Sequence, residues 1–334
     1  MRYRTLGKSG LRVSAIGFGA WGIGGQWGPV ERQTALDTVR AAVDTGVTFF
    51  DTADIYGDPR QGQSEELVGE ALRLVRDRVL IATKAGWWGG AYHHRLPFTH
   101  ASHIELCCDA SLHRLRTDVI DLYQCHYGQI ADPSVFLEAF ETLQKRGKIR
   151  AYGISTNSVR VARRFFADGR GTALQVDYSY LNRLPENHLL PFCKQNSIGV
   201  IARGPLAQGV AAGKFTPAST FNDVRAEMNR DSGRVKFLRQ LAVVERLRPM
   251  ERPGRNLAQL ALQFVLSNDA VSVAIPGAKT PEQARANAAA GDAVLSPEEL
   301  EQVRAAAPVV DYDPGKSDLV SRAKRLAKKV LRRT

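Results

Sequence analysis

The sequence predicts an α/β protein whose body is a (β/α)8 barrel, the TIM-barrel fold, with a β-hairpin before it and a basic helical extension after it. Eight short apolar runs alternate along the chain with amphipathic helical patterns. The runs are continuous rather than alternating, as in parallel strands that are covered by helices. Polar residues follow several of these runs, and a closed barrel would gather such residues at one rim. A doubly wound open sheet is the alternative arrangement.

The expected elements begin with a hairpin over residues 1–14, whose turn contains glycine. The barrel strands are expected over residues 15–20, 48–53, 78–84, 119–126, 148–155, 173–179, 198–204 and 270–277. Apolar residues at helical spacing mark four of the intervening helices: Leu36, Val39 and Val43; Ile104, Cys108, Leu112 and Leu115; Val135, Ala139 and Leu143; Leu257, Leu260 and Phe264. A long irregular stretch, residues 213–232, follows the seventh strand, and a loop of that length is typically functional or mobile.

The net charge of +12 is concentrated at the C-terminus. Residues 315–334 carry eight lysines and arginines against one aspartate, which leaves the first 314 residues at +5. We therefore expect one barrel domain, residues 1–312, and a basic tail, residues 313–334. Nucleic acid is not expected as a partner, because the charge is confined to the tail and no recognition module accompanies it.

The tail has the pattern of an amphipathic helix. Leu319, Ala323, Leu326 and Val330 follow a helical spacing, with basic residues between them. Such a helix could touch an anionic membrane surface or an acidic partner. We favour a helix that packs on its own barrel with a solvated charged face, because amphipathic surface helices are common.

The cysteines indicate a reducing compartment. Cys107, Cys108, Cys125 and Cys193 form no CxxC pair, so neither a disulfide framework nor a zinc site is expected. Their apolar neighbours suggest small buried side chains. The sequence shows no signal peptide and no apolar run long enough to cross a bilayer. We expect a cytoplasmic protein, a monomer or a homo-oligomer, with no metal.

The glycines of GFGAWG, residues 17–22, match the G-x-G-x-x-G spacing of dinucleotide-binding folds. That motif requires its last glycine to open a helix, whereas no helix is expected here before about Glu31. We therefore interpret these glycines as a strand end that passes close to a ligand or to another backbone.

Four residues at the ends of three consecutive strands carry the chemistry. Asp51 and Tyr56 lie in FFDTADIYG, Lys84 ends VLIATK, and His126 ends IDLYQCH. Any one of them could be a structural ion pair or a hydrogen-bonded core group. A carboxylate, a phenol, an ammonium and an imidazole on successive repeats are together a more specific signal. Such a group can protonate a carbonyl oxygen.

The chain resembles the aldo-keto reductases, a superfamily with bacterial members and potassium-channel β-subunits. The resemblance runs in order from residue 4 to about residue 307. It includes RTLGKSGLRVSAIGFGAWGIGG, FFDTADIYG, SEELVGEAL, LYQCH, YGIS, LQVDYS, GPLAQGVAAGKF and AIPGAKTPEQARANAAA. The resemblance implies a barrel, an NAD(P)H cofactor and the reduction of an aldehyde or ketone to an alcohol.

Catalytic roles follow from the same resemblance. Tyr56 would be the proton donor, and Asp51 would hold Lys84 beside it. A free phenol has a pKa near 10, and the neighbouring Lys84 ammonium is expected to depress the pKa of Tyr56. His126 would orient the substrate carbonyl or relay a proton.

Cofactor contacts are carried over by position. Ser155 and Gln175 would bind the carboxamide, backbone amides at Gly204 and Leu206 would face the pyrophosphate, and residues 277–287 would wrap the adenosine phosphate. Because Lys279 and Gln283 lie where a 2′-phosphate would be met, NADPH is favoured over NADH, which stays possible. The full predicted set is Gly19, Ala20, Trp21, Asp51, Ser155, Thr156, Asn157, Gln175, Arg203, Gly204, Leu206, Gly209, Gly277, Lys279, Gln283 and Asn287.

The sequence departs from the family pattern at three places. The fifth strand is followed by Ser155-Thr156-Asn157 instead of Ser-Asn, which leaves the carboxamide ligand open. Arg203 stands where an aromatic side chain often stacks on the nicotinamide. Tyr127-Gly128-Gln129 replaces the usual Pro-Asp after His126.

The predicted substrate pocket is Trp21, Tyr56, Trp87 and His126, with Trp88, Tyr92, His93 and His94 as further candidates. An aromatic lining suits an apolar or sugar-like carbonyl compound. Two other functions remain open: a nucleotide-sugar keto- or enoyl-reductase of a biosynthetic pathway, and a non-catalytic NADP(H)-sensing subunit.

Overall fold

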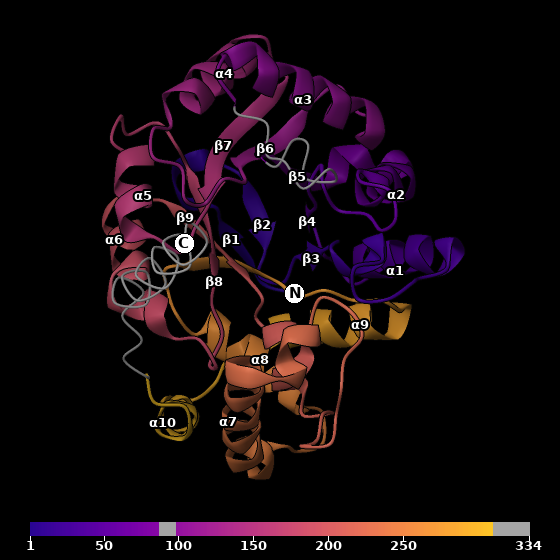
Figure 1. The fold of residues 1–334 in the computed structure, drawn as a ribbon, viewed down its shortest axis with the longest axis vertical. Helices are drawn as coiled ribbons and strands as arrows, with labels where there is room; N and C mark the ends of the chain where they lie inside the picture. The colour runs from indigo at the N-terminus through magenta and orange to yellow at the C-terminus, as the bar shows by residue number, and fades with distance from the viewer. Residues whose placement is uncertain (87–97, 310–334) are drawn as a thin grey trace, which may run out of the picture.

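Eight parallel strands follow one another in chain order around a ring (Figure 1). The computed structural model describes residues 1–86 and 98–309. The strands of the ring are β3 (Phe18–Gly19), β4 (Phe49–Asp51), β5 (Leu80–Ala85), β6 (Ile120–Cys125), β7 (Ile149–Ser155), β8 (Ala173–Asp177), β9 (Gly199–Arg203) and β10 (Val271–Ile275). A doubly wound sheet would reverse its strand order part-way, so this sequential order excludes that alternative and confirms the predicted barrel.

The ring is joined where the segment around β3 meets β10. The amide of Gly17 donates to the carbonyl of Ala274 at 2.8 Å, and the amide of Gly19 donates to the carbonyl of Pro276 at 3.0 Å. A Cβ atom on Gly19 would lie 2.8 Å from the carbonyl oxygen of Ile275. Glycine is therefore needed because another backbone passes this close, as the sequence predicted for this motif.

The N-terminal hairpin covers one end of the barrel. Its strands β1 (Tyr3–Thr5) and β2 (Arg12–Ser14) pair in antiparallel fashion, as predicted. Leu6 and Val13, both fully buried, pack into the cluster of apolar side chains formed by the barrel strands. Gly7 lies against the backbone at Gly199, the first residue of β9. The hairpin therefore covers the N-terminal ends of the strands and leaves the C-terminal ends open.

Helices surround the strands (Figure 1). They are α1 (Arg32–Asp44), α2 (Gln63–Leu72), α3 (Ala101–Leu115), α4 (Ser134–Lys145), α5 (Val159–Phe165), α6 (Leu189–Gln195), α7 (Asp231–Leu247), α8 (Leu257–Leu266), α9 (Pro281–Ala289) and α10 (Pro297–Ala306). The four predicted apolar stripes fall on α1, α3, α4 and α8. Gly22 begins only a three-residue 3-10 helix, and the first α-helix begins at Arg32, where Glu31 caps the amide of Thr34. This geometry confirms that the glycines of residues 17–22 open no dinucleotide-binding helix.

The long connection after β9 is largely irregular, as predicted. It contains the 3-10 helices Ala207–Ala212 and Ala226–Asn229 before α7 begins at Asp231. Trp87, Trp88, Tyr92, His93, His94 and the basic tail lie outside the described residues. Within the part of the chain that the structure describes, no helix has the length and apolar character needed to cross a membrane.

An aromatic cluster fixes α4 on the barrel. Phe140 of α4 is fully buried and contacts Tyr123 of β6 and Tyr152 of β7, with ring centroids 5.6 Å and 5.3 Å away. Phe136 and Phe165 complete the cluster around it. Burial of several large rings against two central strands is a major source of packing energy.

Replacement of Phe140 by Ala should lower the free energy of unfolding by about 3–5 kcal/mol, because the removed ring leaves a cavity among side chains that cannot collapse onto it. Chemical denaturation monitored by circular dichroism would measure the loss. Leu106→Ala, at a side chain of α3 that is 60% exposed, is the control and should change stability by about 0.5 kcal/mol at most. Equal effects of the two variants would contradict the assigned core.

Candidate active site

The predicted catalytic residues converge at the C-terminal ends of three adjacent strands. Asp51 is the last residue of β4, Lys84 is the penultimate residue of β5, and His126 follows β6 directly. Tyr56 lies on the loop after β4, where its amide donates to the carbonyl of Ala53 at 3.1 Å. Parallel strands of a barrel end at one rim, so residues that are 75 positions apart in sequence face the same space.

A buried ion pair forms the base of the site. Lys84 Nζ donates to Asp51 Oδ1 at 2.6 Å and to the carbonyl of Thr52 at 2.7 Å. The Lys84 side chain is completely buried, and that of Asp51 is 3% exposed. Lys84 Nζ also lies 3.5 Å from the hydroxyl of Tyr56. The ammonium thus connects the buried carboxylate to the phenol.

Burial raises the pKa of Tyr56 above its ordinary value, although the Lys84 ammonium acts in the opposite direction. The sequence-based expectation of a depressed pKa is therefore wrong: Lys84 offsets only part of the cost of burying a phenolate. Burial also disfavours the ammonium of Lys84, but the attractions and hydrogen bonds of Asp51 and Tyr56 together outweigh it and hold the pKa of Lys84 above its usual range. Tyr56 is accordingly a protonated phenol beside a permanent cation.

Aromatic rings wall the site. The ring of Tyr56 lies 5.9 Å from the imidazole of His126, nearly edge to face, and 6.1 Å from the ring of Trp21. Trp27 packs against Trp21 at 5.3 Å. The sequence analysis overlooked Trp27, although an aromatic residue in a glycine-rich segment at a strand end was a signal that could have identified it.

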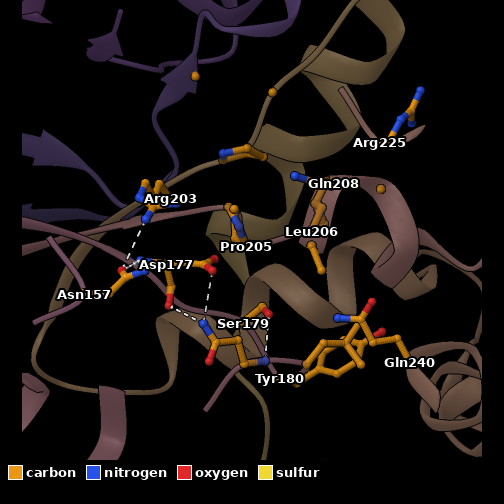
Figure 2. A pocket seen from close by; sticks show the side chains of 18 of the residues that line it. Asn157, Asp177, Ser179, Tyr180, Arg203, Pro205, Leu206, Gln208, Arg225 and Gln240 are labelled. Atoms are coloured by element: carbon orange, nitrogen blue, oxygen red, sulfur yellow. Dashed lines mark hydrogen bonds between the residues drawn. The ribbon is translucent and has the colours of Figure 1, made fainter. Parts of the chain in front are cut away.

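A cavity of about 3030 Å³ opens from this point and extends toward α7 and α9. Its lining contains every predicted cofactor residue except Ala20, which is buried behind it. Tyr56 and His126 also face the cavity, whereas Lys84 lies below its surface. In Figure 2, Arg203, Asn157 and Asp177 gather at one end of the pocket and Arg225 lies at the other.

The three residues at the end of β7, Ser155, Thr156 and Asn157, have different hydrogen-bond partners. Thr156 Oγ1 donates to the carbonyl of Gly128 at 2.6 Å, and Asn157 Oδ1 accepts from the amide of Asp177 at 3.0 Å and from Arg203 at 3.3 Å. The Thr156 hydroxyl and the Asn157 amide oxygen are thereby engaged within the protein. Ser155, whose hydroxyl lies 3.4 Å from Gln175 Oε1, keeps capacity toward the cavity.

Two cations that the sequence analysis did not assign to the cofactor, Lys214 and Arg225, line the far part of the cavity together with the predicted Lys279. Burial, together with the nearby charges of Arg225 and Lys279, lowers the pKa of Lys214. Arg225 is held by Asp223 at 2.5 Å and stacks over Phe221 at 4.9 Å. Only the fold brings these cations together, because Lys279 belongs to a different loop, before α9.

Comparison with known proteins places this geometry in a family. The profile of the aldo/keto reductase family matches residues 15–308. The chain belongs to that family. Aldo-keto reductase YhdN of Bacillus subtilis is 35% identical over 86% of this chain and 87% of its own length. The NADH-specific methylglyoxal reductase of Escherichia coli is 33% identical, over 89% and 95% of the two chains.

Solved structures of aldo-keto reductases have the same fold as this chain. A Klebsiella pneumoniae aldo/keto reductase in complex with NADP and acetate superposes with a TM-score of 0.71 at 31% identity. The superposition covers 94% of this chain and 98% of the other. The present chain is therefore an oxidoreductase of the aldo-keto reductase type, as the sequence motifs implied.

A second carboxyl group, that of the half-buried Asp54, lies beside Lys84, with the Asp54 amide donating to the Lys84 carbonyl at 3.3 Å. Burial raises the pKa of Asp54 to about 8, and the nearby Glu65 carboxylate adds to the rise while Arg114 and Lys84 oppose it. Asp54 Oδ1 has no hydrogen-bond partner among the described residues. Glu65, by contrast, accepts from Thr83 and from Arg114, both at 2.6 Å. Asp54 is therefore a neutral acid near pH 7.

Asp54 should make the fold less stable as pH rises from about 4 to about 8. In that range the unfolded chain has released the proton, whereas the folded chain still holds it, so unfolding is favoured by proton release. Asp54→Asn lacks this proton, and its melting temperature relative to wild type should increase across that range. Thermal melts between about pH 5 and pH 9 would measure the difference, with the exposed Asp118→Asn as control. A difference that does not depend on pH would contradict the assignment.

Proposed function

We propose that this protein reduces an aldehyde or ketone to an alcohol with NADPH, with Tyr56 as the proton donor. The observation that carries the proposal is the chain of contacts from Asp51 through Lys84 to the Tyr56 hydroxyl, at 2.6 Å and 3.5 Å, at the edge of a large cavity. Intact acid and cation partners favour catalysis over a purely sensing role.

Protein groups at the site act on the carbonyl oxygen. A bound nicotinamide would supply a hydride to the carbonyl carbon, and the π-electron pair would then collect on oxygen. Tyr56 donates its phenolic proton to that oxygen, and Lys84 stabilises the phenolate that remains. His126, whose ring stands across from that of Tyr56, orients the carbonyl.

The cavity lining suits a dinucleotide phosphate. Ser155 and Gln175 offer polar atoms on the Asp51 side of the cavity, where a carboxamide would lie. Lys214, Arg225 and Lys279 provide positive charge at a distance from it. The N-terminus of α9, capped by Thr280, also opens onto the cavity and favours an anion. This charge supports NADPH over NADH, although the E. coli relative named above keeps NADH as the alternative.

The substrate end is aromatic. Trp21, Tyr56 and His126 form a concave wall that suits an apolar or sugar-like carbonyl compound. A keto-sugar reductase is thus a narrower form of the same proposal. The buried thiols of Cys108, Cys125 and Cys193 suit a reducing cytoplasm.

Tyr56→Phe should lower kcat for carbonyl reduction by about 10²- to 10⁴-fold, because the proton donor is lost while the ring remains. NADPH oxidation followed by absorbance over a panel of aldehydes, ketones and keto-sugars would measure it. The Tyr152→Phe variant removes a buried hydroxyl that has no partner among the described residues and should keep wild-type turnover. Wild-type turnover in Tyr56→Phe would refute the role of Tyr56. No turnover in wild type despite NADPH binding would favour the sensing role.

Lys279→Met should weaken the preference for NADPH over NADH by about tenfold or more, because a charge-assisted hydrogen bond to the 2′-phosphate is lost. Kd values of both dinucleotides, from quenching of tryptophan fluorescence, would give the ratio. Lys194→Met, an exposed lysine paired with Asp269, is the control. An equal loss of affinity for both dinucleotides would place Lys279 on a part of the cofactor that they share.

A further inference from the structure

The carboxylate of Asp51 is held on both of its oxygens. Oδ1 accepts from Lys84, whereas Oδ2 accepts from Gln175 Nε2 at 2.8 Å and from Gln124 Nε2 at 3.2 Å. The side chains of Gln124 and Gln175 are almost completely buried. They come from β6 and β8, and Asp51 comes from β4. Residues on alternate barrel strands meet across the interior in this way.

Gln124 serves no other partner. Its Oε1 makes no hydrogen bond within the described residues, and it does not line the cavity. Gln175 differs, because it faces the cavity and its Oε1 lies near Ser155. Asp51 therefore determines the orientation of the Gln124 amide. In the opposite orientation, Gln124 Oε1 would point at the Asp51 carboxylate, and two acceptors would face each other.

We infer that Gln124 is a positioning residue for proton donation by Tyr56, acting through Asp51 and Lys84. The inference rests on the proposed reductase activity. Loss of one of the two donors to Oδ2 weakens the hold on that oxygen, so the carboxylate would turn toward sharing both oxygens with Lys84. That rotation would draw Nζ away from the Tyr56 hydroxyl, which is already at 3.5 Å. Gln124 and Gln175 together keep Oδ1 alone directed at the ammonium.

The register of the strands supports this role. Lys84 and Gln124 are direct partners in the pairing of β5 with β6, so their Cα atoms are fixed side by side. Gln124 is also two residues before His126, which directly follows the same strand. One strand and the residue after it thus carry both the amide that holds Asp51 and the imidazole at the site.

Gln124→Met keeps the length of the side chain and removes its donor. We expect kcat to fall by about 10- to 100-fold, as for a small misplacement of catalytic groups, with KM for the carbonyl substrate and Kd for NADPH changed less than about threefold. The pH limb of kcat that reports Tyr56 should move to higher pH, because a displaced Lys84 lowers the pKa of Tyr56 less. Gln263→Met, at another buried amide, on α8, is the matched control and should leave kcat, its pH limb, KM and Kd unchanged.

The Gln124→Glu variant distinguishes two possible roles of the Gln124 side chain: positioning Asp51 and filling space in the core. When protonated, the new carboxyl group can donate to Asp51 Oδ2; when ionised, it repels that carboxylate. Activity relative to wild type should therefore be highest near pH 6 and should fall by about tenfold or more toward pH 9. A core-filling role predicts no such pH dependence.

The outcomes distinguish this inference from the proposed function. Wild-type kcat and pH profile in Gln124→Met would overturn the positioning role. A second result would also overturn it: Gln124→Glu could lose the same fraction of wild-type activity at every pH. In that case lower thermal stability and weaker NADPH binding would accompany the loss. Absence of turnover in wild type would instead refute the proposed function itself.

Discussion

The contact between Lys84 and Asp51 is the constraint on which the rest of the site depends. Two opposite charges lie in the barrel interior at 2.6 Å, almost without solvent exposure. Removing one partner of such a pair leaves an uncompensated buried charge, at a typical cost of about 3–5 kcal/mol. The pair exists only because β4 and β5 are adjacent in register and end at the same rim. Its geometry therefore depends on the correct closure of the barrel.

The same pair determines the protonation state of Tyr56, our proposed proton donor. Burial alone would make the phenolate very unfavourable, and the Lys84 ammonium offsets part of that cost. The phenol consequently stays protonated before the reaction, yet its conjugate base has a cation beside it when the proton leaves. A donor in reduction needs both properties: the proton must be present at the start, and the charge that its departure creates must be stabilised.

The kind of side chain that lines the site changes with distance from the Lys84–Asp51 pair. Amides from β6 and β8 surround Asp51, and aromatic rings face the space above Tyr56. The cations Lys214, Arg225 and Lys279 lie farther along the cavity, on loops that follow later strands. The cavity thus has aromatic side chains at the end beside Tyr56 and cations at its far end. This arrangement suits a ligand that carries its phosphates at a distance from its reactive ring.

The sequence by itself determined the barrel and singled out the residues that we propose as catalytic. Continuous apolar runs specify buried parallel strands, and Asp51, Lys84 and His126 could be placed because each lies at the end of such a run. It did not indicate the role that we propose for Gln124, because an amide within a buried strand resembles ordinary core until another strand brings a carboxylate to it. It also gave the wrong direction for the pKa of Tyr56. Neighbouring charges can be guessed from a motif, but desolvation depends on how completely the surrounding chain excludes water, and only the tertiary structure decides that.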